Sequence, residues 1–367
     1  MMASTVLASF VLAPLFLCVD ATLERVVLVS RHGIRERLVK HHTHLGEAGG
    51  TRIEGGPALT DDGLLHLSRV GAVLRELYLA PACASVGTCL ADPDDDDGLD
   101  GHEIRAESSG LARTLGTANV LLQSLAPPPT ASLHVQRPVP VYSQPDSSDY
   151  LLRGYAGEKC AAFTAAIRAW QTTAAYRAKE AESVSLRAEV AAVLLAAGRA
   201  TDLELSVNPG TASRAVPLRD WWNAYDALAT ADAPLLPAAT MRRAEALLAW
   251  LEAHKFGQAV GGSLCGGALL AAILDRLTAP LAGPGRSDGN AGSGPRLVFY
   301  SAHYPTLLCL LSSLGISADS GEAADSWLAE QLLGEGSVLA FELHLAGDGS
   351  TSVQLWLLNG TEVHRRE

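Results

Sequence analysis

The sequence predicts an α/β protein with a mostly parallel central sheet flanked by helices, an inserted α-helical cap and a C-terminal hairpin. Two observations support this fold class. Two short apolar runs, 25–30 and 296–301, each lead through a polar loop into a helical pattern, which is typical of parallel strands buried beneath helices. The stretch 157–277 is rich in alanine and leucine and has no alternating strands, so it predicts a cluster of helices. With 367 residues, the chain can bury a sizeable core.

The elements of the first part follow from residue spacing. The run 25–30 is continuous and β-branched, as in a strand buried on both faces. Thr60 is a candidate N-cap for a helix, and 109–125 is a second amphipathic helix. Residues 139–142 (VPVY) predict a short edge strand, because proline is tolerated at sheet edges. The apolar positions at helical spacing after Thr60 are Leu64, Leu67, Val70, Leu74 and Leu77.

The predicted domains are a core formed by 22–150 and 291–367 and a helical cap formed by 151–290. A flexible linker rich in glycine, proline and serine, 281–295, precedes the return to the core. There a strand ends near Ser301, a loop holds His303, and a helix carries proline in its first turn. Two alternating segments around a Gly-Asp-Gly-Ser turn then predict the terminal hairpin.

Residues 1–21 are interpreted as a secretory signal peptide. An apolar run from Val6 to Val19 precedes small residues, although the segment before it has no lysine or arginine. The run is shorter than the roughly 20 residues of a membrane span. A buried first strand stays open as the alternative. We therefore expect a secreted protein or one in the lumen of the endomembrane or lysosomal system, with no integral membrane span in the mature chain.

The cysteines and a glycosylation sequon are consistent with a secretory route. Five cysteines follow the predicted signal peptide, so at least one has no partner within the chain. Cys83 and Cys89 are close enough in sequence to pair, but sequence alone does not fix the connectivity. The sequon beginning at Asn359 predicts a glycoprotein.

The charge distribution limits the partners. The net charge is −12 and no long basic stripe occurs, which argues against nucleic acid and against an anionic membrane surface as partners. Any anion-binding site must therefore be local.

One local site is indicated by Arg31, His32 and Arg35, directly after the first strand. Ligands of open α/β sheets bind at the carboxyl ends of strands, where both His32 and His303 are expected. Arg31 and Arg35 are four residues apart, so one helical turn would place both guanidinium groups on one side. With Arg113 near the start of another helix, three cations would surround the site. A tetrahedral dianion is the ligand that this arrangement predicts.

The segment SRHGIR resembles the Arg-His-Gly-x-Arg signature of the histidine phosphatase superfamily, in its acid phosphatase and phytase branch, known as the histidine acid phosphatase family. Four further segments are similar to family segments in the same order. They are LTDDGLLHLSRVGAVLRELY, SGLARTLGTA, VPVYSQPDSSDYLL and YSAHYPTLLCLL. The resemblance therefore covers nearly the whole chain after the predicted signal peptide.

The resemblance implies an acid phosphatase that hydrolyses phosphate monoesters through a phosphohistidine. His32 would be the nucleophile, and Arg31, Arg35, Arg113 and His303 would bind the phosphoryl oxygens. It implies no metal and no cofactor, since three guanidinium groups can supply the charge neutralisation. The substrate would be a phosphorylated small molecule or a phosphoprotein, and the oligomeric state is left open.

The sequence departs from the family pattern at two positions. Arg37 stands where proline is usual, and Tyr304 stands where an aspartate protonates the leaving alcohol. A phenol with a pKa of ~10 matches acidic or neutral catalysis poorly. The alternative is therefore a catalytically impaired pseudophosphatase that binds phosphorylated ligands. Other candidate acids, which sequence alone cannot place, are Glu107, Asp61, Asp62, Asp146 and Asp149.

Two further clusters are given structural interpretations. His41, His42 and His44 have no cysteine or carboxylate at ligand spacing, which favours a loop near the site over a zinc site. The segment DWWNAYDAL, 220–228, is interpreted as cap core, with substrate-pocket lining as the second interpretation.

Overall fold

The computed structural model describes residues 21–36, 56–90, 99, 103–126, 139–156, 159–199, 206–207, 214–231, 233–279, 294–316, 334–360 and 362–366. The predicted signal peptide before residue 21, Arg37 and the histidines at 41, 42 and 44 lie outside the described residues.

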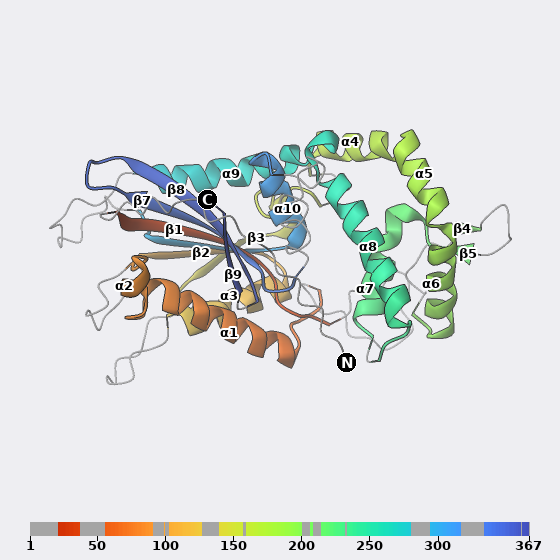
Figure 1. Cartoon of the computed structure of the whole chain (residues 1–367), viewed down its shortest axis with the longest axis horizontal. Helices are drawn as coiled ribbons and strands as arrows, with labels where there is room; N and C mark the ends of the chain where they lie inside the picture. The colour runs from red at the N-terminus through yellow and green to blue at the C-terminus, as the bar shows by residue number, and fades with distance from the viewer. Residues whose placement is uncertain are drawn as a thin grey trace, which may run out of the picture.

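A seven-stranded sheet in the order β3-β2-β6-β1-β7-β8-β9 forms one end of the molecule (Figure 1). Its parallel part is β1 (Thr22–Arg31), β6 (Leu297–Ala302), β2 (Ile104–Ser109) and the edge strand β3 (Val141–Gln144). Both apolar runs are thus parallel neighbours, as predicted, and every residue from 25 to 30 is buried. The edge strand begins two residues later than predicted, and β2 was missed because its sequence, IRAESS, mixes charged and small residues.

The other part of the sheet is antiparallel and contains the predicted hairpin. Strand β7 (Val338–Leu345) pairs with β1 on one side and with β8 (Thr351–Asn359) on the other. The turn between them places Gly349 at φ +83°, a left-handed conformation that glycine adopts without strain. A third strand, β9 (Glu362–Arg366), follows β8 and was not predicted.

Helices cover both faces of the sheet (Figure 1). Residues of β1 alternate between two apolar clusters, Val26 and Leu28 facing one and Val27 and Val29 the other. The first cluster includes α1 (Asp61–Tyr78) and α3 (Ala112–Leu125). The second includes α9 (Ser263–Thr278) and α10 (Tyr304–Ser313). Burial on both faces explains why this strand is a continuous apolar run.

Helix α1 begins as the sequence predicts. The side chain of Thr60 accepts a hydrogen bond from the backbone N–H of Gly63 at 3.0 Å, which caps the helix. Leu67, Val70 and Leu74 are fully buried, whereas Leu64 is 39% exposed, so its place in the apolar face was predicted wrongly.

The remaining helices lie beside the sheet and mostly form a separate layer (Figure 1). They are α4 (Ala161–Gln171), α5 (Ala174–Glu182), α6 (Val184–Ala196), α7 (Trp221–Ala229) and α8 (Ala238–Lys255). Helices α5 to α8 enclose their own apolar cluster around the fully buried Trp221. Helix α9 instead packs on the sheet through Leu269 and Ile273, so the predicted cap, 151–290, includes one helix of the sheet layer. Short elements are α2 (Cys83–Val86), β4 (Ser206–Val207), β5 (Arg214–Ala215) and three 3₁₀ turns, Asp146–Ser148, Leu218–Asp220 and Gln258–Val260.

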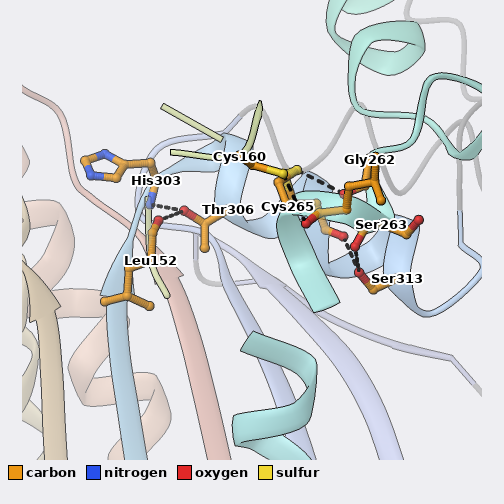
Figure 2. The surroundings of a disulfide bond; sticks show 10 residues. Leu152, Cys160, Gly262, Ser263, Cys265, His303, Thr306 and Ser313 are labelled. Atoms are coloured by element: carbon orange, nitrogen blue, oxygen red, sulfur yellow. Dashed lines mark hydrogen bonds between the residues drawn. A yellow bond between two sulfur atoms is a disulfide. The ribbon is translucent and has the colours of Figure 1, made fainter. Parts of the chain in front are cut away.

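The described part of the chain contains two disulfides. Cys83 pairs with Cys89, one of the pairings that the sequence allows, and Cys265 pairs with Cys309 to join α9 to α10 (Figure 2). Among the described residues, Cys160 is the free cysteine. None of the helices described is long and apolar enough to cross a bilayer.

Candidate active site

The two histidine loops converge because the strands before them are parallel neighbours. Arg31 at the end of β1 is opposite Ala302 at the end of β6. The next residues, His32 and His303, therefore lie side by side, with ring centroids 5.4 Å apart in an edge-to-face arrangement. The backbone N–H of His32 also donates to the carbonyl of Ala302 at 3.0 Å.

The tautomer of His32 follows from its hydrogen bond. Its Nδ1 lies 2.9 Å from the carbonyl oxygen of Gly33, and because a carbonyl only accepts, Nδ1 carries the proton. Nε2 is left with its lone pair. Burial, then the nearby charges of Arg31 and Arg113, hold the pKa of His32 well below its ordinary value of 6.5. The imidazole is therefore neutral and nucleophilic.

Gly33 packs closely against α1. A Cβ atom there would lie 2.6 Å from a methyl carbon of Leu67 on α1. The backbone N–H of Gly33 donates to the hydroxyl of Thr117 at 3.1 Å, and that hydroxyl donates to the carbonyl of Arg113 at 2.8 Å. The loop of His32 is thus fixed against both α1 and α3.

His303 is held at the start of α10. Its Nε2 is 2.9 Å from the hydroxyl of Ser109 at the end of β2. The backbone N–H of His303 donates to the hydroxyl of Thr306, which donates to the carbonyl of Leu152 (Figure 2). Burial, then Arg113 and His32, lower the pKa of His303 well below 6.5, so this imidazole is neutral too.

Arg31, Arg35 and Arg113 all lie around the two histidines. Arg31 is ion-paired with Glu335 at 3.3 Å. Burial, then Arg35, lower the pKa of Arg113 to about 10. In all three arginines the Nε atom is buried and has no hydrogen-bond partner among the described residues. A buried donor without an acceptor costs about 1–3 kcal/mol, so an oxygen-rich anion would be stabilised here.

Arg35 is also held from the helical layer. Its Nη2 lies 2.5 Å and its Nη1 3.4 Å from the two carboxylate oxygens of Asp226 on α7. The ring of Trp222, one turn earlier, has its centre 5.8 Å from the guanidinium carbon of Arg35. Asp226 was not among the predicted site residues, because nothing in the segment 220–228 indicates Arg35 as its partner.

Arg153 is a fourth cation that sequence analysis missed. It forms an ion pair with Asp146, and its charge contributes to the low pKa of His303. Its Nε is likewise buried without a partner among the described residues. It follows directly on a segment that resembles the family, and only its position after Leu152 could have drawn attention to it.

Tyr304 is the first residue of α10 and points at a buried carboxylate. Its hydroxyl lies 2.5 Å from Oε2 of Glu252 on α8. The guanidinium carbon of Arg31 is 5.4 Å from the centre of the Tyr304 ring, and Trp222 stacks on that ring at 6.3 Å. Burial, then the charge of Glu252, raise the pKa of Tyr304 well above 10. Sequence analysis did not identify Glu252.

None of the five candidate acids contacts His303 or Tyr304 through a hydrogen bond that the described residues show. Glu107 pairs with Arg105 and Arg276, and Asp146 with Arg153 and Lys159. Asp149 accepts from the backbone N–H of Leu152 at 2.8 Å, and burial raises its pKa. Asp61 and Asp62 are exposed at the start of α1.

A cavity of about 1190 Å³ lies between the sheet layer and the helical layer. Arg31, Arg35 and Tyr304 line it on the sheet side, and Trp222 and Tyr225 on the helical side. Trp221 is fully buried in the helical core. Both interpretations of the segment 220–228 therefore hold, each for different residues. Charged residues further along the cavity wall are Glu36, Asp62, Arg199, Asp226, Arg242, Glu245 and Glu335.

Comparison with known proteins finds an acid phosphatase and phytases. The chain is 28% identical to lysosomal acid phosphatase of Bos taurus over 360 residues, which are 94% of this chain and 72% of that protein. The chain is similar to this acid phosphatase over most of its length. No protein-family model matches the chain.

Solved structures of two phytases and of an inositol polyphosphate phosphatase share the fold. The phytase of Citrobacter braakii superposes with a TM-score of 0.58 at 18% identity, covering 92% of this chain and 85% of that one. A phytase of Hafnia alvei gives 0.57 at 16% identity, covering 94% and 85%. The multiple inositol polyphosphate phosphatase of Bifidobacterium longum, in complex with phosphate, gives 0.53 at 15%, covering 97% and 89%. The predicted α/β fold class is confirmed.

Proposed function

We propose that this chain is a phosphomonoester hydrolase of the histidine acid phosphatase type, with His32 as the nucleophile. The observation that carries the proposal is the state of His32. Its Nδ1–H is fixed to the carbonyl of Gly33, and its free Nε2 lies among arginines whose buried Nε donors lack partners among the described residues. The acid phosphatase and phytases to which the chain is similar support the same reaction class.

The reaction follows from these positions. Arg31, Arg35, Arg113 and His303 bind the phosphoryl oxygens and neutralise the charge that they share in the transition state. Nε2 of His32 attacks phosphorus as the bond to the leaving oxygen breaks, and water then hydrolyses the phosphohistidine. The carbonyl of Gly33 stabilises the Nδ1–H throughout. Phosphorylated small molecules are the substrate class that we assign.

Replacement of the nucleophile tests the proposal. His32→Ala should abolish hydrolysis of p-nitrophenyl phosphate and leave the circular dichroism spectrum unchanged, because His32 lies in a loop. His254→Ala is the matched control, since His254 lies on α8 beside Trp250. Wild-type activity in His32→Ala would rule out the phosphohistidine mechanism.

A pseudophosphatase is the second candidate, and one observation favours it. The hydroxyl of Tyr304, which stands in place of the family's acid, donates its hydrogen bond to Glu252. An assay on p-nitrophenyl phosphate, whose leaving group needs little protonation, and on an alkyl phosphate separates the candidates. Hydrolysis of neither substrate, together with phosphate binding seen as a rise in melting temperature, would favour the binding protein.

We also propose a secreted or luminal location. Two disulfides are consistent with an oxidising compartment, and the bovine relative is named as lysosomal. Mass spectrometry of protein expressed through a eukaryotic secretory pathway should find the mature N-terminus near residue 22. The same spectra test glycosylation of Asn359, whose side chain accepts a hydrogen bond from Ser337. Retention of Met1 in the exported protein would contradict signal cleavage.

A further inference from the structure

Glu252 is the one carboxylate for which the described residues show a hydrogen bond to Tyr304. It is 1% exposed and comes from α8, whereas Tyr304 begins α10. Tyr304 lines the cavity, and its phenol oxygen lies 2.5 Å from Oε2 of Glu252. Glu252 itself does not line that cavity. A proton on Glu252 could therefore reach a bound substrate through the phenol.

We propose that Glu252 and Tyr304 together form the general acid of this enzyme, with Glu252 supplying the proton and Tyr304 relaying it to the leaving oxygen. This inference rests on the proposed hydrolase function and deepens it. It also accounts for a tyrosine where the family has an aspartate, because the proton comes from a carboxylic acid and the phenol only passes it on.

The proton balance closes without any other reactant. In the first step Nε2 of His32 bonds to phosphorus, the bond to the leaving oxygen breaks, and that oxygen takes the proton of Tyr304. Tyr304 donates to Glu252 in the structure, and protonation of Glu252 reverses this hydrogen bond. The phenol oxygen then takes the proton of Glu252, which becomes a carboxylate again. In the second step water bonds to phosphorus as the bond to Nε2 breaks. A proton of that water passes to Tyr304, whose own proton returns to Glu252.

The surroundings of the pair support this relay. The raised pKa of Tyr304 keeps the phenol protonated between turnovers. Lys255, one turn after Glu252, lies 3.4 Å from its Oε1, and the Lys255 side chain is 32% exposed. The pair therefore has Lys255, which reaches solvent, beside Glu252, and Arg31 beside the ring of Tyr304. Asp226, another carboxylate in the cavity wall, is ion-paired with Arg35.

The test compares substrates that differ in their need for protonation. Glu252→Gln keeps an oxygen that can accept the Tyr304 hydrogen bond but has no proton to give. We expect kcat/KM for an alkyl phosphate to fall by about 10²–10⁴-fold, and kcat/KM for p-nitrophenyl phosphate to stay within a few-fold of wild type. Glu189→Gln is the matched control, because Glu189 is an exposed carboxylate on α6.

Tyr304→Phe gives a second measurement that does not depend on the folding of Glu252→Gln. It should show the same selective loss, and the double variant should lose no more than either single one, because the two residues act as a unit. Equal losses on both substrates, or additive losses, would mean that Glu252 is only structural and would overturn the relay. A selective loss in Asp149→Asn and not in Glu252→Gln would assign the proton to another acid. If wild type hydrolyses neither substrate, the proposed function itself fails.

Discussion

Two buried carboxylates, Glu342 and Glu252, each accept a hydrogen bond from a tyrosine, and they lie in different surroundings. Glu342, in the middle of the sheet on β7, is fully buried. It binds the hydroxyl of Tyr78 at 3.0 Å, the indole N–H of Trp356 at 2.7 Å and Nε2 of His344 at 3.1 Å. Glu252, at the junction of the two layers, binds Tyr304 and Lys255.

This difference distinguishes a carboxylate with a structural role, Glu342, from one with a proposed catalytic role, Glu252. Donors from α1, β7 and β8 fix Glu342, and neither it nor these donors line the cavity, so its contacts stabilise the packing of α1 against the antiparallel strands. Glu252 has one short contact, and that contact leads to the cavity. Burial alone does not identify a catalytic acid. The path from the acid to the substrate does.

Removal of Glu342 should have the largest effect on stability. Glu342→Ala leaves the buried donors of Tyr78 and Trp356 without this acceptor, so we expect the free energy of unfolding to fall by about 4 kcal/mol. Glu342→Gln, which keeps one acceptor oxygen, should lose less. Denaturant titration measures both. The ratio of alkyl to aryl phosphate hydrolysis should not change in the folded fraction. A change in that ratio would contradict a purely structural role for Glu342.

Asp226→Asn should have the next largest effect, and phosphate should reduce it. Without the Asp226 carboxylate, the buried charge of Arg35 loses its partner, which should cost about 3 kcal/mol. Bound phosphate would supply a new counter-charge, so the loss should be smaller in millimolar phosphate. Thermal unfolding with and without phosphate measures the difference. An equal loss in both buffers would show that phosphate does not reach Arg35.

The pH dependence of stability should reflect His32 and His303. Their pKa values are lowered in the folded state, so below about pH 6.5 the unfolded chain binds protons that the folded chain does not. The contribution of the two neutral histidines to the free energy of unfolding is therefore fully present above pH 6.5. It decreases as the pH falls, by about 1–2 kcal/mol per histidine at pH 5. The difference in unfolding free energy between wild type and His303→Gln, measured from pH 7.5 to 5, should narrow accordingly. A constant difference would contradict the buried neutral imidazole.

Phosphate binding should give the smallest of these four changes in the free energy of unfolding. At ten times its dissociation constant it should contribute about 1.4 kcal/mol by linkage. Arg113→Gln should lose most of this gain, because Arg113 offers a buried donor in the site. Sodium chloride at the same ionic strength is the control. A shift of equal size in Arg113→Gln would place the phosphate elsewhere.

Local sequence signals were sufficient for the two central parallel strands of the sheet, β1 and β6. The runs that form β1 and β6 are apolar because both strands are buried on two faces, and the signature residues follow them directly. The strands β2 and β9 were missed because charged residues interrupt their apolar pattern. Helices near Thr60 and after His303 had caps or turn residues to mark them.

The partners of the site residues could not be predicted in the same way. Glu252 is 52 residues from Tyr304, and Asp226 is 191 residues from Arg35. Each contact depends on how the helical layer packs against the sheet, which no local pattern encodes. In sequence, Glu252 is one of several charged residues on an ordinary helix. The position of Tyr304 was predicted from the resemblance, but its partner required the fold.

The phosphohistidine is the central claim, and the most direct measurement is its detection. Wild-type protein is mixed with p-nitrophenyl phosphate, quenched in alkali within milliseconds to preserve the phosphorus–nitrogen bond, digested and examined by mass spectrometry. We predict one phosphoryl group on His32, bonded through Nε2 because the Nδ1–H is held by Gly33, and none in His32→Ala. Turnover with no phosphorylated His32, or with the phosphoryl group on another residue, would contradict the account.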